Sequence, residues 1–149
     1  MRAVVQRASF GSVTVDNKVV GQIDEGLVVL IGVEKADGDK DVKYLVDKIS
    51  GLRIFRDEED KMNLSVKDIG GSILAISQFT LLGDVRKGKR PSFSNAENPE
   101  TANMLYQQVL SGLREEGLRV EEGVFQADMM VKIHNNGPVT ILLDSHKEF

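Results

Sequence analysis

The segment ILAISQFT at residues 73–80 decides how this chain can fold. Its four apolar residues predict a strand covered on both faces, and Ser77, Gln78 and Thr80 place polar groups at the strand's end. Buried polar groups need partners, because burying them unpaired costs free energy. Either these side chains bond locally, or the strand opens into a pocket with free backbone N–H groups. The second alternative requires a bend, because alternate side chains on a straight strand, Phe79 included, point to opposite faces.

Several strands are expected around this segment. Residues 27–31 form another continuous apolar run, typical of a central strand. Residues 13–20 predict a hairpin around an Asp-Asn-Lys turn, and alternation around residues 3–5 predicts a first strand. Near the end of the chain, residues 129–134 alternate as in a half-exposed strand, and residues 139–143 predict the last strand.

Two amphipathic helices complete the predicted fold. One follows the turn at residues 37–39, with apolar residues at helical spacing from Val42 to Leu52. The other begins at Asn98-Pro99, where a capping side chain precedes proline. The pattern predicts one α+β domain over residues 1–149. Its mostly antiparallel or mixed sheet, a barrel-like β core, is packed by these two helices.

Composition excludes several classes of protein. The chain has no cysteine, so disulfides and thiolate chemistry are unavailable, which fits a reducing compartment. The longest apolar run, residues 27–33, is far shorter than a membrane span, and no signal peptide is evident. We therefore expect no membrane contact. A net charge of −4 argues against indiscriminate nucleic-acid binding but allows a local basic patch.

The common hydrolytic chemistries find no support in the residues. No serine stands in a G-x-S-x-G elbow, and only two histidines exist. His134 is expected on the surface of a strand, and His146 lies in a polar tail expected to fray. No His, Cys or carboxylate set has metal-ligand spacing, so no metal is expected. The remaining means of catalysis are positioning of the substrate and electrostatic stabilisation by backbone N–H groups. These suit an activated substrate such as an ester.

A second unusual segment is NNGPVT at residues 135–140. Asn-Gly is a strong hairpin signal, so the simplest interpretation of Asn135, Asn136 and Gly137 is a tight turn that precedes a strand at Pro138. Statistics alone favour a trans Gly137-Pro138 bond, since only about 5–6% of such bonds are cis. Proline here also removes a donor and leaves carbonyl acceptors exposed.

A cluster of cations follows the first segment. Arg86, Lys87, Lys89 and Arg90 place four positive charges within five residues of an acidic protein. They form either a solubilising loop or a contact for phosphate groups, and the sequence alone gives the two interpretations equal support.

Together, SQFTL at 77–81 and NNGPVT at 135–140 closely resemble the two signature motifs of the D-aminoacyl-tRNA deacylase family. The two motifs stand in the family's order, and the resemblance covers the whole chain. It also includes VQRA at 5–8, GVE at 32–34, RIF at 53–55, KMNL at 61–64 and RPSF at 90–93.

The resemblance implies a homodimeric cytoplasmic enzyme that hydrolyses the ester between a D-amino acid and the 3′-terminal adenosine of tRNA. It also implies removal of glycine mischarged onto alanine tRNA, and no metal or organic cofactor. By the same resemblance, residues 77–80 are catalytic, and Asn135, Asn136, Gly137 and Pro138 bind substrate and select its chirality.

In the family the glycine-proline bond is cis and reaches across the dimer interface into the partner's pocket. The resemblance assigns Arg7 the task of holding that motif in place. An aminoacyl ester is activated and carries a neighbouring ribose hydroxyl, which agrees with a site that lacks a protein base.

Two other functions stay open at this point. A non-catalytic RNA-binding module could use the cations at 86–90 for phosphates and Phe79 or Phe93 for stacking. A dimeric scaffold could use the Asn-Gly segment only to build an interface.

Overall fold

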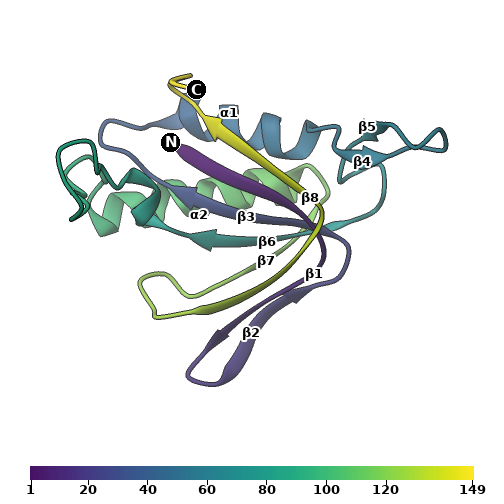
Figure 1. The fold of residues 1–149 in the computed structure, drawn as a ribbon, viewed down its shortest axis with the longest axis horizontal. Coiled ribbons are helices and arrows are strands. Elements are labelled where there is room, and N and C mark those ends of the chain that lie inside the picture. Colours follow the sequence, from purple (N-terminus) through teal and green to yellow (C-terminus); the bar gives the residue numbers. More distant parts are fainter.

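A mixed six-stranded sheet with two helices dominates the fold of residues 1–149 in this computed structural model (Figure 1). In chain order the elements are β1 (Arg2–Val15), β2 (Lys18–Ile23), β3 (Gly26–Gly32), α1 (Asp39–Gly51), β4 (Phe55–Arg56), β5 (Met62–Leu64), β6 (Ser72–Ser77), the 3-10 turn η1 (Phe79–Leu82), α2 (Pro99–Glu115), β7 (Arg119–Glu122) and β8 (Met130–Asp144). The sheet order is β2-β1-β3-β6-β7, and β8 also pairs with β1. The pairs β3–β6 and β6–β7 are parallel and the others antiparallel, which confirms the predicted α+β class with a mixed sheet.

β6 is buried on both of its faces, as its apolar run predicts. Ile73 and Ala75 belong to the larger core cluster, which also contains residues of both helices. Leu74 and Ile76 belong to a second cluster on the opposite face. The alternation of side chains along the strand therefore divides its four apolar residues equally between two cores.

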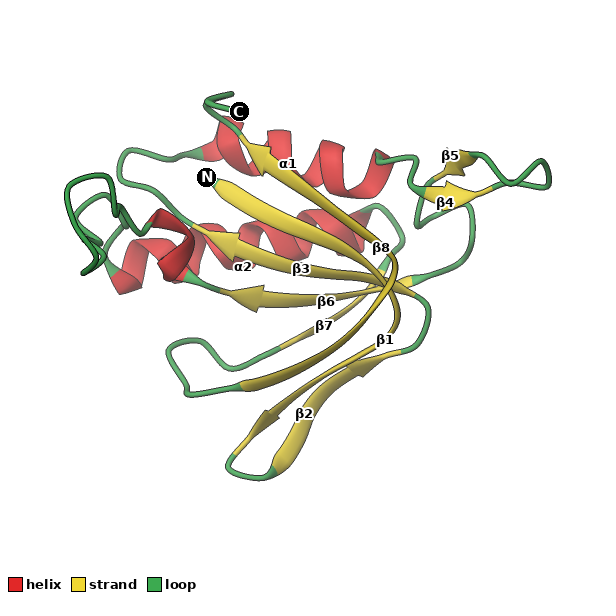
Figure 2. Cartoon of the chain, in the orientation of Figure 1, coloured by secondary structure: helices red, strands yellow, loops and turns green.

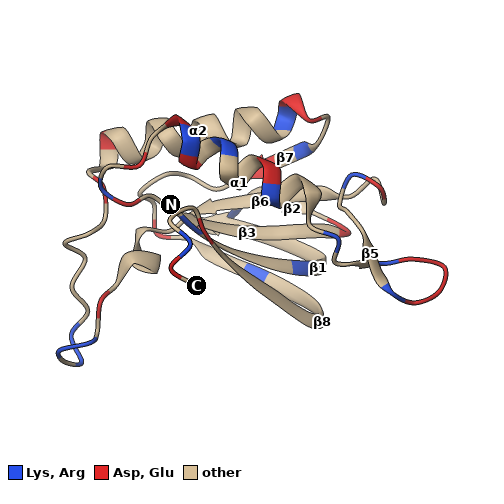
Figure 3. Cartoon of the chain, turned by 90° about the horizontal axis from the view of Figure 1, so that it is seen from above, with Lys and Arg blue, Asp and Glu red and all other residues tan.

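Both helices cover the same face of the sheet (Figure 3). Leu45 and Ile49 from α1 and Leu110 from α2 are fully buried against it. The predicted start of α2 is confirmed, since the Asn98 side chain accepts a hydrogen bond of 3.0 Å from the Thr101 amide and proline follows at the first helical position. Neither helix is both long enough and apolar enough to cross a membrane.

The other face of the sheet is covered by strands that curl over it, which gives the core its barrel-like form (Figure 2). The first part of β1 pairs with β3, while its second part pairs with β2 in the predicted hairpin. Ala8, Val13 and Ile23 from the curled part pack onto Leu74 and other residues of the second cluster.

The hairpin predicted at residues 135–138 is wrong. β8 continues through this segment, and both of its halves pair with β1 in the same direction. Asn135 pairs with Ala8 and Thr140 with Gln6, so five steps along β8 face two steps along β1. The extra residues bulge out of the ladder instead of reversing the chain, and a bulge of this kind re-aims side chains without ending a strand.

The fully buried Leu110 offers a test of the helix-covered core. We expect Leu110→Ala to lower the free energy of unfolding by about 2–5 kcal/mol, because it removes apolar contacts and leaves a cavity. Met104→Ala on the same helix, at a side chain 53% exposed, is the matched control and should change stability by less than about 0.5 kcal/mol. Urea denaturation measures both values, and equal effects would contradict the assignment of the core.

Candidate active site

The chain bends directly after β6, as required for residues 77–80 to line one pocket. η1 begins at Phe79, and the amide of Gln78 donates 2.8 Å to the carbonyl of Ile31 on β3. Arg2 donates from Nη1 to the carbonyl of Leu81 at 3.1 Å, which ties the turn to β1 as well. The backbone N–H groups of Phe79 and Thr80 are the first two of this turn and find no hydrogen-bond acceptor within it.

The polar side chains of this segment are less buried than the sequence predicts. Ser77 and Gln78 are half-buried, while Phe79 and Thr80 are exposed. Gln78 donates from Nε2 to Oγ1 of Thr80 at 3.0 Å. The strand therefore ends at the surface, and these groups meet both local partners and solvent.

A cavity of about 520 Å³ opens beside the turn. All four residues from Ser77 to Thr80 line it, so the structure brings this predicted set together. Its other walls include residues that the sequence interpretation did not assign to a substrate pocket: Phe93, Glu97, Phe125, Gln126, Ala127 and Met129. Phe93 lies in the RPSF segment of the resemblance, but the segment from 125 to 129 carries no pattern that would reveal its place.

The Gly137-Pro138 segment protrudes from β8 in a fixed conformation. Its peptide bond is cis, so the statistical expectation of trans is wrong and the bond the resemblance implies is present. Gly137 has a φ of +130°, and a Cβ there would lie 2.8 Å from Nη2 of Arg7. Glycine is therefore required both by the backbone and by the neighbouring guanidinium.

Arg7 and Asn135 hold this protruding segment. The side chain of Arg7 is 4% exposed and donates from Nε to the carbonyl of Asn136 at 3.0 Å and from Nη1 to the carbonyl of Ile54 at 2.8 Å. Asn135 accepts from the amide of Val139 at 3.1 Å through Oδ1. The contact that the resemblance implies for Arg7 is thus made to the backbone just before Gly137.

The two signature segments lie at opposite ends of the sheet within one chain. The cavity beside Ser77 includes Val33, which follows β3. Gly137 instead lines a separate hollow with Glu25, before β3, and Ile69, before β6. In Figure 1 the bend of β8 lies at the far end of β6 from the teal turn. Six residues of strand separate the two ends by on the order of 20 Å, so one chain cannot join both segments in a single pocket.

The basic loop projects from the body of the fold (Figure 3), and Phe93, which follows the loop, lines the cavity. Its base is closed by two backbone hydrogen bonds between Asp84 and Ser92, of 2.8 and 2.9 Å. Arg86 binds Asp84 through Nη2 at 2.6 Å and Nε at 2.9 Å, and these bonds lower the pKa of Asp84 to about 2. Arg86 is therefore paired locally with Asp84, while Lys87, Lys89 and Arg90 are exposed and form no ion pair.

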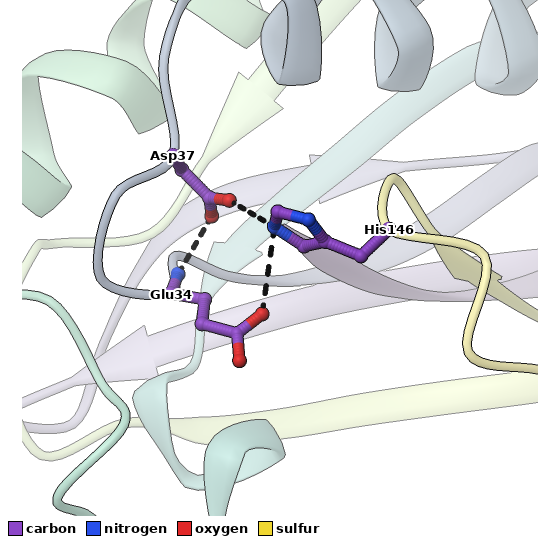
Figure 4. Close-up of side chains that lie close together, drawn as sticks. All are labelled: Glu34, Asp37 and His146. Carbon is purple, nitrogen blue, oxygen red and sulfur yellow. Dashed lines mark hydrogen bonds and ion pairs between the residues drawn. The ribbon is translucent and has the colours of Figure 1, made fainter.

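His146 is not in a frayed tail, which corrects that expectation. Its Nε2 lies 2.8 Å from Asp37 and 3.6 Å from Glu34, so the fold brings together a histidine and carboxylates that the sequence spacing did not reveal (Figure 4). The buried carboxylate of Asp37 also accepts from the ammonium of Met1 at 2.9 Å and from the amide of Glu34 at 2.7 Å. Since cationic and neutral donors already occupy the Asp37 oxygens, the cluster suits an ion-pair network better than a metal site.

The comparisons with known proteins agree with one another. The family model described as "D-Tyr-tRNA(Tyr) deacylase" matches residues 4–144. The chain is similar to the D-aminoacyl-tRNA deacylases of Koribacter versatilis, 60% identical, and Clostridioides difficile, 58% identical, each over the full length of both chains.

Two solved structures have the same fold. One is the "c-Myc DNA Unwinding Element Binding Protein", with 42% identity, a TM-score of 0.91 and coverage of 97% of this chain and 98% of that one. The other is a probable eukaryotic D-amino acid tRNA deacylase, with 19% identity, a TM-score of 0.79 and coverage of 95% and 97%. The second likeness bears on the fold alone.

The contacts of His146 predict a pH-dependent contribution to stability. Its hydrogen bond to Asp37, opposed by partial burial and by the Met1 ammonium and aided by the charges of Asp37 and Asp41, raises the pKa of His146 above its ordinary 6.5. A raised pKa in the folded state means that this stabilisation is fully present below pH 6.5 and is lost as the pH rises through the folded pKa.

We therefore expect His146→Gln to lower the free energy of unfolding more at about pH 6 than at about pH 9. Urea denaturation at the two pH values measures the difference. His134→Gln, at an exposed histidine that makes no hydrogen bond or ion pair, is the matched control. Equal destabilisation by His146→Gln at both pH values would contradict the ion-pair network.

Proposed function

The chain belongs to the D-aminoacyl-tRNA deacylase family, which consists of hydrolases, and on that premise we propose the substrate and the chemistry of its site. The substrate is the ester between a D-amino acid and the 3′-terminal adenosine of tRNA. Hydrolysis releases the free amino acid and intact tRNA. The observation that carries this proposal is the cavity of about 520 Å³ that opens beside the leading amides of η1.

In this proposal the backbone, and not a protein base, stabilises the reaction. Water adds to the ester carbonyl, and the negative charge on its oxygen is met by the amides of Phe79 and Thr80. One such donor is worth roughly 3–4 kcal/mol. The bond between the carbonyl carbon and the ribose oxygen then breaks, and the ribose oxygen takes up the proton that the attacking water has lost. The adjacent ribose hydroxyl assists the attack of water. Neither histidine takes this role, because His146 is bound to Asp37 and His134 lies on β8.

We further propose that each site is completed by a second copy of the chain. Gly137 and Pro138 are exposed and lie at the wrong end of the sheet for their own cavity. If the protruding segment of one subunit meets the cavity of a second, two-fold symmetry makes the exchange reciprocal. This supports the cross-subunit site that the resemblance implies.

Selection of chirality then follows from exclusion of the L configuration. A pocket that accepts many D side chains cannot select by fitting them, so it must reject the mirror image. The carbonyls of Gly137 and Pro138 from the second copy form a wall that an L side chain would strike. A D side chain would point away, and glycine would present only hydrogen, which supports action on glycine mischarged onto alanine tRNA.

The rest of the tRNA meets the basic loop. Lys87, Lys89 and Arg90 face solvent and suit contacts to phosphates, while Arg86 is paired with Asp84. The site needs no cofactor in this scheme. We place the reaction in the cytoplasm, where charged tRNA is used.

Incubation with D-Tyr-tRNA and L-Tyr-tRNA tests the function directly. We expect the protein to release D-tyrosine and to leave the L ester intact. A non-catalytic RNA-binding module would instead protect the D ester, and that result would refute the proposal.

The Thr80 hydroxyl is predicted to be dispensable as a nucleophile. Its oxygen already accepts a hydrogen bond from Gln78, and no histidine lines the cavity to take its proton. Thr80→Ala should therefore lower kcat by less than about 10-fold, against the 10²- to 10³-fold typical of losing an oxyanion donor. Trapping of an aminoacyl ester on Thr80 would overturn this expectation.

A subunit-mixing experiment tests the shared site. Phe79→Pro removes one amide donor at the first position of η1, where proline is tolerated, and Gly137→Ala strains the protruding segment. Each variant alone should lose more than about 10²-fold in kcat. Random mixing should restore about one quarter of wild-type activity, since half the dimers are mixed and each has one intact site. Activity no greater than the sum of the two variants would contradict a shared site.

A further inference from the structure

Two aromatic rings at the edge of the cavity are exposed to solvent. The rings of Phe79 and Phe93 lie edge to face, with centroids 5.1 Å apart and planes at 74°. The side chains are 57% and 38% exposed, and both line the cavity. Large apolar side chains at a cavity mouth present a surface on which another flat group can stack.

The backbone around Phe93 holds its ring in place. Ser92, immediately before it, is paired with Asp84 through two backbone hydrogen bonds. The ring lies close against Gly83, where a Cβ would be 3.1 Å from Cε1 of Phe93. The bidentate contact of Arg86 with Asp84 adds a local restraint on the first residues of the same loop. Phe93 is therefore held at the base of the loop, and the Phe79 ring packs edge to face against it.

The loop that carries Phe93 also carries cations that nothing neutralises. Lys87, Lys89 and Arg90 are exposed and without ion pairs in a protein whose net charge is −4. Aromatic rings beside unpaired cations are the combination that binds single-stranded nucleic acid, with bases on the rings and phosphates on the cations. A subunit interface would also cover the rings, but the three neighbouring cations favour a polyanion.

We infer that the Phe79–Phe93 pair is a stacking platform for the base that precedes the terminal adenosine of the tRNA. The terminal nucleoside enters the cavity, and the next base rests on the rings at its mouth. The phosphates of the unpaired acceptor end then run along Lys87, Lys89 and Arg90. This inference rests on the proposed function and assigns a specificity role to Phe93 beyond it.

The experiment compares D-Tyr-tRNA with the same substrate carrying an abasic residue at the penultimate position. For the wild type, the abasic change should lower kcat/KM roughly 5- to 150-fold, as expected for the loss of one stacked base. For Phe93→Leu the ratio of kcat/KM for the intact substrate to kcat/KM for the abasic substrate should fall to near one, because the ring that the base contacts is gone. Phe93→Trp should keep the ratio of the wild type, and so should the control Met104→Ala, whose side chain lies outside the cavity.

A binding measurement gives a second readout that does not depend on turnover. When the tRNA carries 2-aminopurine at the penultimate position, binding to the wild-type protein should quench the fluorescence of the 2-aminopurine. Binding to Phe93→Leu should not quench it. A wild-type ratio near one, or an unchanged ratio in Phe93→Leu, would overturn the platform while hydrolysis of intact D-Tyr-tRNA persists.

Failure of the proposed function gives a different result, namely no hydrolysis of either substrate, and it would remove the platform as well. Sedimentation distinguishes the alternative occupant. If Phe93→Leu converts a dimer to a monomer, the rings belong to the subunit interface and the inference is wrong.

Discussion

The parallel pairing of β3 with β6 is the constraint on which the rest of the structure depends. β6 is buried on both faces, by the helices on one side and by the curled strands on the other, so its two ends are held at a fixed separation. One end leads into η1 and the cavity, and the other lies beside the protruding segment of β8. Because the core between them is rigid, the two signature segments can meet only across two copies of the chain.

The chemistry that this arrangement supports is positional. Neither histidine reaches the cavity, and the hydroxyl of Thr80 is engaged by Gln78. Backbone amides and carbonyls do not depend on side-chain identity, and they are oriented by the turn at η1 and by the bulge in β8. In the proposed mechanism such groups act on an ester that is already reactive and discriminate by shape, which agrees with membership in a family of D-aminoacyl-tRNA deacylases.

Much of the fold could be predicted because local patterns and burial agree. The apolar run of β6 and the Asn98 cap of α2 each specify a structure that the tertiary fold then uses. The hairpin prediction for residues 135–138 failed because Asn-Gly permits a turn but does not require one, and β8 pairs with β1 on both sides of the segment. The prediction that His146 lies in a frayed tail failed because its partners Asp37 and Glu34 are more than a hundred residues away in the sequence. Motifs based on spacing do not reach that far. The wall of the cavity near Phe125 has the same long-range origin.

The central claim is that the site selects by excluding L substrates from binding. Competition by stable D-, L- and glycyl-adenosine analogues against hydrolysis of D-Tyr-tRNA measures this most directly. The structure and its proposed dimer predict inhibition by the D and glycyl analogues and none by the L analogue at the same concentrations. Equal inhibition by the D and L analogues would contradict the account, since discrimination would then have to arise after binding.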